Sequence, residues 1–199
     1  MIPETNKTEP YLESNAIIDW KGTEVQKVSD QLTSELTDKI EIARRLYEWV
    51  RDDIDHSNDI GTDIVTCTAS EVLTAKTGMC YAKSHLLAGL LRAQNIPTGF
   101  CYQILKSSSP ETETVVHALN AIYCFKLKKW ILIDARGNTD LIKTEFSLDH
   151  ESLAYVVDVT QGEYTHETIY THPPECIVHV LQSFESRKEM IPNLPQQLR

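Results

Sequence analysis

The chain has 199 residues, of which 41% are hydrophobic and 24% are charged, a composition typical of one globular domain with a full core. Its 29 acidic and 19 basic side chains give a formal charge of -10 without a dense basic run, which argues against nucleic acid as a partner. The sequence has no window of transmembrane length, and residues 1–11 lack the pattern of a secretion signal. Five irregularly spaced cysteines indicate reduced thiols. We therefore expect a cytoplasmic protein with a single domain over residues 1–199 and no membrane partner.

The N-terminal part of the chain predicts an irregular arm followed by two helices. Residues 1–22 are mostly polar and include two prolines, which favours irregular structure. Two helix start signals follow, each with a glutamine or glutamate three positions after a capping residue: Thr23 with Gln26, and Asp38 with Glu41. Apolar side chains then recur at helical spacing, so we expect each helix to bury one face against the body of the protein.

The middle of the chain predicts a buried helix that begins at a cysteine. Residues 56–66 read as a polar loop, and Thr68 with Glu71 caps a short helix after it. Directly after Cys80, residues 81–93 are apolar on nearly every side, which is typical of a helix enclosed by the core. We expect this segment to be the central helix of the domain.

Three strands of an antiparallel sheet are predicted after this helix, over residues 99–105, 115–125 and 130–134. Side chains alternate between the two faces of a strand, so His117 shares a face with Leu119, and Asp134 shares a face with Leu132. His117 and Asp134 can therefore meet across neighbouring strands.

The C-terminal part of the chain carries weaker patterns. Residues 153–157 predict a strand, and Gly162 predicts a turn. Pro173 and Pro174 precede apolar residues at helical spacing, which predicts a last helix. We expect residues 173–199 to form this helix and an irregular tail.

A cysteine, a histidine and an acid in this order have the chemistry of acyl transfer. Cys80 begins a helix, where unpaired N–H groups and the helix dipole favour a thiolate nucleophile. His117 can take up the thiol proton and later donate a proton to the leaving group. Asp134 can orient the imidazole and stabilise its charged form. The backbone N–H of Cys80 would stabilise the negative charge that develops on the attacked carbonyl oxygen.

Five segments carry a resemblance to a known family: residues 69–73, 78–82, 90–97, 116–120 and 130–135. Together they resemble the transglutaminase-like superfamily of papain-type cysteine enzymes over residues 38–148, and the whole chain resembles its small bacterial stand-alone members. The resemblance implies an α+β fold in which the central helix carrying the cysteine packs on an antiparallel sheet, with an N-terminal helical part. It also implies Cys80 as the nucleophile, His117 as the acid and base, and Asp134 as the partner of His117.

The chain departs from the animal cross-linking enzymes of that superfamily, which carry additional domains, calcium sites and a tryptophan near the oxyanion. The sequence has no tryptophan between Trp49 and Cys80, so a different residue must supply the second oxyanion donor. The candidates are His56, Ser57 and Gln103.

The predicted function is cysteine-dependent acyl transfer through a thioester, with hydrolysis of peptide or side-chain amide bonds as the leading hypothesis. The expected substrate is a peptide, a protein or a small amide, and no cofactor or metal is expected. Protein-glutamine transamidation uses the same chemistry with an amine in place of water, and is the first alternative. An inactive peptide-binding module with the same fold is the second alternative.

Other cysteines and histidines receive structural interpretations. Cys67, Cys101 and Cys124 are expected to fill the core or lie incidentally at the surface, and His85 to be a hydrogen-bonded helix residue. A zinc-binding adaptor would require the C-terminal group His166, His172, Cys176 and His179. Only Cys176 and His179 have a clean helical separation, which argues against such a site.

Overall fold

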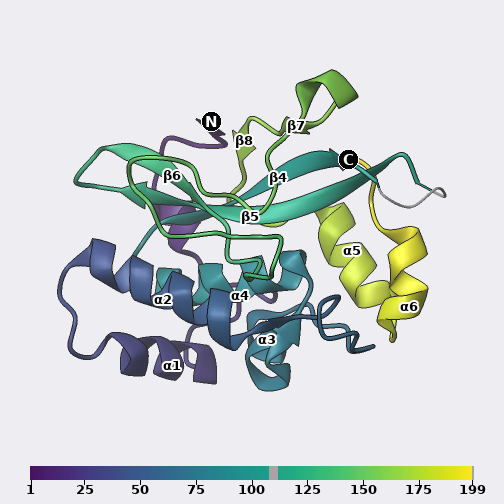
Figure 1. Ribbon diagram of the computed structural model, residues 1–199. Helices are drawn as coiled ribbons and strands as arrows, with labels where there is room; N and C mark the ends of the chain where they lie inside the picture. Colours follow the sequence, from purple (N-terminus) through teal and green to yellow (C-terminus); the bar gives the residue numbers. More distant parts are fainter. Residues whose placement is uncertain (108–111, 199) are drawn as a thin grey trace.

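The computed structural model describes residues 1–107 and 112–198 (Figure 1). The α-helices of these residues are α1 (Glu24–Thr33), α2 (Lys39–Asp53), α3 (Ala69–Ala75), α4 (Cys80–Ala93), α5 (Glu175–Ser183) and α6 (Arg187–Met190). The strands are β1 (Ile2–Pro3), β2 (Asp55–His56), β3 (Thr77–Gly78), β4 (Thr98–Lys106), β5 (Thr114–Cys124), β6 (Lys129–Ile133), β7 (Tyr164–Thr165) and β8 (Thr168–Ile169). Short 3-10 helices are η1 (Glu9–Leu12), η2 (Val159–Gln161) and η3 (Ile191–Asn193).

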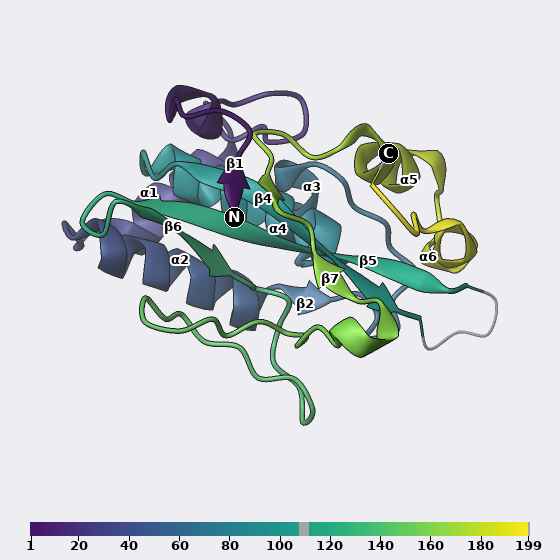
Figure 2. The same ribbon diagram turned by 90° about the horizontal axis from the view of Figure 1, so that it is seen from above.

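The main sheet has four strands in the order β6-β5-β4-β7, and every neighbouring pair is antiparallel. Helices α1 to α4 lie on one side of it, and α5 and α6 flank one end (Figures 1 and 2). In the register of the central pair, Gln103 of β4 lies opposite His117 of β5. On the other side of β5, its residue Asn120 lies opposite Ile133 of β6. The mixed helix and sheet architecture confirms the predicted α+β fold.

Helix α4 is the centre of the core. All residues from Cys80 to Arg92 are buried, because α4 packs on β5 on one side and is covered by α1, α2 and α3 on the other. Its all-round apolar sequence matches this position, since a helix enclosed by protein has no need for a polar face. Asn120 anchors α4 to the sheet, because its side-chain amide donates a 3.1 Å hydrogen bond to the Ser84 carbonyl oxygen.

The predicted helix starts are confirmed by their caps. Asp38 accepts backbone hydrogen bonds from Ile40 and Glu41, and Thr68 and Glu71 form a complete capping box at α3. Thr23 caps α1 through a hydrogen bond from the backbone N–H of Val25. These contacts are local in sequence, which is why the pattern predicted them.

Two predictions about the C-terminal part are wrong. Residues 153–157 form no strand, because the Ala154 N–H and the Tyr155 carbonyl oxygen bind side chains instead of a neighbouring strand. The tail after α5 is more ordered than expected, since it forms α6 and η3. The side chain of Ser186 caps α6. Arg187 fixes α6 to the loop after β2, because the Arg187 Nε donates a 2.6 Å hydrogen bond to the Thr62 carbonyl oxygen.

The N-terminal arm is also more structured than expected. Strand β1 pairs in parallel with β8, and η1 places Tyr11 in a small second core behind the sheet. The Tyr11 hydroxyl donates a 3.0 Å hydrogen bond to the Ile169 carbonyl oxygen. Over the described ranges, no helix combines the length and the apolar character needed to cross a membrane.

Candidate active site

Cys80 lies at the start of α4, immediately after the turn that leaves β3. Strand β3 pairs in parallel with β2, which places His56 opposite Gly78. A Cβ atom at Gly78 would lie 3.0 Å from Thr66 Oγ1 and 3.1 Å from the Ala82 Cβ, so this close packing favours glycine. As the first residue of α4, Cys80 has no acceptor within the helix for its N–H.

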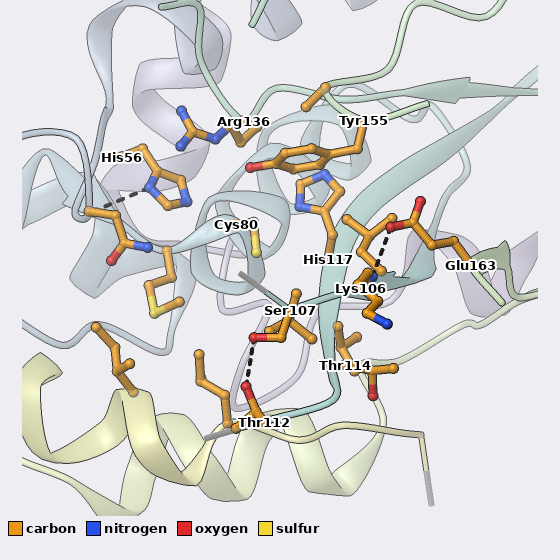
Figure 3. A pocket seen from close by; sticks show the side chains of 18 of the residues that line it. His56, Cys80, Lys106, Ser107, Thr112, Thr114, His117, Arg136, Tyr155 and Glu163 are labelled. Carbon is orange, nitrogen blue, oxygen red and sulfur yellow. Dashed lines mark hydrogen bonds between the residues drawn. The ribbon is translucent and has the colours of Figure 1, made fainter. Parts of the chain in front are cut away.

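Cys80 and His117 line one cavity of about 660 Å³. His117 comes from β5, and Figure 3 shows its ring beside the Cys80 sulfur. The His117 Nε2 and Asp134 Oδ2 atoms are 2.8 Å apart, so the carboxylate binds the Nε2 side of the ring. The structure thus brings His117 and Asp134 together as the strand faces predicted, and it places the Cys80 sulfur beside the same ring (Figure 3).

Asp134 is fully enclosed, with 1% of its surface exposed. Besides His117, its carboxylate accepts a 2.8 Å hydrogen bond from the Ala154 N–H and a 3.1 Å hydrogen bond from the Arg136 N–H. Because these donors occupy both carboxylate oxygens, the orientation of Asp134 is fixed before any substrate binds.

The electrostatics of the pair favour a charged histidine. Burial by itself disfavours the protonated ring, but the Asp134 carboxylate and Cys80 outweigh it and raise the pKa of His117 to about 10. Burial likewise opposes ionisation of Asp134, and the charge and hydrogen bond of His117 overcome it and lower the pKa of that carboxyl group. At neutral pH the geometry thus favours an imidazolium ion held between Asp134 and Cys80.

A segment beyond the main strands covers His117. The Tyr155 ring packs edge-on against the His117 ring, with 4.8 Å between centroids. Gln103 holds this segment, because its Nε2 donates a 3.1 Å hydrogen bond to the Tyr155 carbonyl oxygen. The sequence did not indicate Tyr155, since its approach to His117 depends on the fold of residues 134–155.

The three candidates for a second oxyanion donor occupy different positions. His56 is buried in the cavity wall, whereas Ser57 and Gln103 do not line the cavity. The Ser57 backbone N–H donates to the Gly78 carbonyl oxygen at 3.1 Å, and Gln103 is engaged with Tyr155.

An ion pair borders the same cavity next to His56. Both terminal nitrogens of Arg136 donate to the Asp59 carboxylate, with 2.8 Å between Nη2 and Oδ1. Because Asp59 balances the charge of Arg136, we interpret Arg136 as a structural residue of the cavity wall. Binding of a substrate carboxylate is not needed to explain its position.

The remaining cysteines and histidines lie elsewhere. Burial raises the pKa of Cys67 to about 12 and also raises the pKa of Cys101, as expected for core thiols. His85 is enclosed in α4, and its Nδ1 lies 2.7 Å from the Cys67 carbonyl oxygen. Within residues 1–107 and 112–198, no group of three or more His, Cys, Asp or Glu side chains could hold a metal ion, and this includes the C-terminal His and Cys group.

The tail contributes a wall that the sequence did not suggest. Ile191, Pro192 and Leu194 line the cavity opposite Tyr155 and Val156. The tail reaches the sheet near the start of β5, where the Thr114 hydroxyl donates a 2.8 Å hydrogen bond to the Gln196 carbonyl oxygen. Nothing local in the tail sequence marks this contact, because its partners are about 80 positions away.

Comparison with known sequences places the chain in a family. The sequence profile of the transglutaminase-like superfamily matches residues 26–135, which is more than half of the chain and includes Cys80, His117 and Asp134. The chain therefore belongs to the transglutaminase-like superfamily, which consists of cysteine-dependent enzymes and their relatives. No curated protein matches the chain in sequence.

The chain resembles two solved structures, of which the first shows the same fold. A crystal structure of a candidate cysteine protease from Cytophaga hutchinsonii is 19% identical, with a TM-score of 0.55 over 66% of this chain and 43% of that chain. The periplasmic domain of TgpA from Pseudomonas aeruginosa is 12% identical, with a TM-score of 0.49 over 64% of this chain and 46% of that chain. The matched parts thus span less than half of the length of these structures.

Proposed function

We propose that the protein is a cysteine hydrolase that cleaves peptide or side-chain amide bonds through a thioester. One observation carries the proposal: Cys80 lies beside His117 (Figure 3), the His117 Nε2 is 2.8 Å from the Asp134 carboxylate, and the thiol and imidazole line a cavity large enough for a substrate. Membership of a superfamily of cysteine-dependent enzymes supports the same chemistry.

The reaction begins with the Cys80 thiolate beside protonated His117. The sulfur attacks the substrate carbonyl carbon, an S–C bond forms, and the carbonyl electron pair moves onto oxygen. When this pair returns, the C–N bond breaks, and His117 donates its proton to the leaving amine. His117 then takes a proton from water, which attacks the thioester and releases the acid product and the thiolate. Asp134 keeps Nδ1 of His117 directed at the sulfur through both halves of the reaction.

The test uses peptides from a digested proteome incubated with the protein in water enriched in oxygen-18, with a dansylated alkylamine added. Hydrolysis places the heavy isotope in new carboxyl groups, whereas transamidation attaches the dansyl group, and mass spectrometry distinguishes the two products. We expect isotope incorporation that disappears in Cys80→Ala. Cys176→Ala is the matched control, because Cys176 is a partly buried thiol on α5 and does not line the cavity.

Three results would contradict the proposal. Full turnover in Cys80→Ala would exclude the thioester mechanism. Dansyl attachment without isotope incorporation would indicate a transamidase. Peptide binding to the wild-type protein without any turnover would indicate an inactive binding module.

A further inference from the structure

The attacked carbonyl oxygen needs more than one donor, and the structure contains a buried side chain suited to the task. This inference rests on the proposed function. The Cys80 N–H is one donor, since the start of α4 leaves it without an acceptor in the helix. Acyl-transfer sites stabilise the oxyanion with donors fixed before the reaction, so a second group should lie on the cavity wall near the thiol.

His56 is held beside Cys80 by backbone pairing. The parallel pairing of β2 with β3 places His56 opposite Gly78, two residues before the nucleophile. A 3.1 Å hydrogen bond from the Ser57 N–H to the Gly78 carbonyl oxygen continues this pairing. Figure 3 shows the His56 and His117 rings on opposite sides of the Cys80 sulfur. A carbonyl group attacked by this sulfur would therefore lie between the general acid and His56.

The hydrogen bonds of His56 define which ring nitrogen carries the proton. The Asn58 backbone N–H donates to His56 Nδ1 at 3.3 Å, so Nδ1 is an acceptor and the proton of the neutral ring is on Nε2. We propose that the Nε2–H of His56 is the second oxyanion donor of this protein. This role uses a neutral imidazole, in contrast to the charged His117 on the other side of the thiol.

The surroundings of His56 keep its ring neutral. Burial lowers the pKa of His56 to about 3, and the positive charges of Arg136, Lys83 and His117 act in the same direction. Asp59 opposes them, but its carboxylate is already paired with Arg136. A neutral donor cannot compete with His117 for the thiol proton, and the positive groups behind it favour the oxyanion as it forms.

The other two candidates do not reach the cavity. The Ser57 hydroxyl has no hydrogen-bond partner among the described residues, but Ser57 is 1% exposed and does not line the cavity, and its N–H is used by the Gly78 carbonyl oxygen. The Gln103 amide donates to the Tyr155 carbonyl oxygen and lies outside the cavity wall. Of the three, His56 alone lines the cavity.

The experiment compares two small neutral reagents that react with the same thiolate. With p-nitrophenyl acetate, the sulfur attacks the carbonyl carbon, an oxyanion forms, and the C–O bond then breaks to release p-nitrophenolate. With iodoacetamide, the sulfur displaces iodide from carbon, and no oxyanion forms. Peptide mass spectrometry assigns both modifications to Cys80, so the ratio of the two rate constants reports the oxyanion donors separately from thiol activation.

We expect the ratio of acylation to alkylation to fall about 100-fold in His56→Leu, the loss typical of one oxyanion donor. His56→Gln should restore most of the ratio, because its amide places an N–H donor close to the Nε2 position. His150→Leu is the control and should leave the ratio unchanged, since His150 is exposed and outside the cavity. Thermal unfolding of each variant checks that the fold is kept.

The results that overturn the inference differ from those that overturn the proposed function. An unchanged ratio in a folded His56→Leu variant, or equal losses of both rates, would exclude His56 as the donor. If wild-type Cys80 is neither acylated nor alkylated faster than Cys176, the proposed function fails and the inference fails with it.

Discussion

His117 links the chemistry of the site to the stability of the fold. In most proteins a histidine enclosed to this extent would lose its proton, yet here Asp134 and Cys80 more than compensate for burial. Two of the seven histidines of the chain thus line the same cavity in different charge states. Burial disfavours the protonated form of both rings: at His56 it is the main cause of the lowered pKa and the nearby positive groups add to it, whereas at His117 the Asp134 carboxylate and Cys80 outweigh it.

The raised pKa of His117 predicts a loss of stability at alkaline pH. A folded-state pKa of about 10 exceeds the unfolded value near 6.5, so the stabilisation is complete below pH 6.5 and disappears as pH rises towards 10. We expect the free energy of unfolding in urea to decrease by a few kcal/mol over this window, on the order set by 1.4 kcal/mol per pKa unit. His117→Gln should show a flatter profile, and parallel profiles would contradict the assignment.

At the scale of elements, the junction between β3 and α4 determines where the nucleophile lies. Gly78 packs against Thr66 and Ala82, and β2 on its other side carries His56. Any shift of this junction would move the thiol and the proposed oxyanion donor together. The close approach at Gly78 is thus a requirement of the site as well as of the core.

Gly78→Ala tests this requirement. The added methyl group would lie 3.0 Å from Thr66 Oγ1 and 3.1 Å from the Ala82 Cβ, so the Thr66 side chain and the start of α4 must give by a few tenths of an ångström. We expect a loss of about 1–3 kcal/mol in unfolding free energy, as for overpacked cores, and slower acylation of Cys80. Gly22→Ala has space for a methyl group but a positive φ of 75°, so it should cost stability without slowing acylation. Equal acylation rates in both variants would show that the junction tolerates movement.

The extent to which elements could be predicted depends on how local their contacts are. Helices with caps such as Thr68 and Glu71 follow from neighbouring residues, and so do the long strands of the sheet. The two-residue strands β1, β2, β3, β7 and β8 exist only because distant segments pair, and no pattern marks them. Residues 153–157 have β-type composition, but their backbone groups bind Asp134 and Gln103, and this outcome depends on tertiary structure.

In the candidate site, too, the residues on patterned elements could be predicted and those placed by long-range contacts could not. The strand faces predicted that His117 and Asp134 would meet, because both follow strongly patterned strands, and their 2.8 Å contact agrees with this prediction. The place of Cys80 at the start of the buried helix was also predicted. The Tyr155 cover and the tail wall could not be predicted, since both come from irregular segments placed by long-range contacts.

At the scale of the whole molecule, the C-terminal tail completes the substrate cavity. Arg187 anchors it, with 2.7 Å between its Nη1 and Asn58 Oδ1 in addition to its bond with Thr62. Ile191 and Leu194 then form an apolar wall opposite Val156, whose side chain is 92% exposed at the rim. The wall is thus held by the half-buried Arg187 side chain, by the Thr114 contact with Gln196, and by packing.

Arg187→Ala should release this wall while the core stays folded. We expect faster amide hydrogen exchange over residues 191–198 and weaker binding of acyl donors with apolar side chains, seen as a KM several-fold higher at similar kcat. Lys188→Ala is the matched control, because the Lys188 Nζ lies 3.8 Å from Asp63 Oδ2 and this ion pair is largely exposed. If both variants exchange like the wild type, the tail is held without Arg187.

Two long-range contacts have a consequence for the newly made chain. They are the hydrogen bond from the Ala154 N–H to the Asp134 carboxylate and the pairing of β1 with β8. During synthesis the cysteine emerges long before residue 154, and the N-terminal arm emerges long before its partner strand at residues 168–169. The orienting carboxylate therefore lacks its full set of donors until most of the chain has left the ribosome. We expect a nascent chain stalled before residue 150 to show no acylation at Cys80, so that the thiol would become reactive only when the fold is complete.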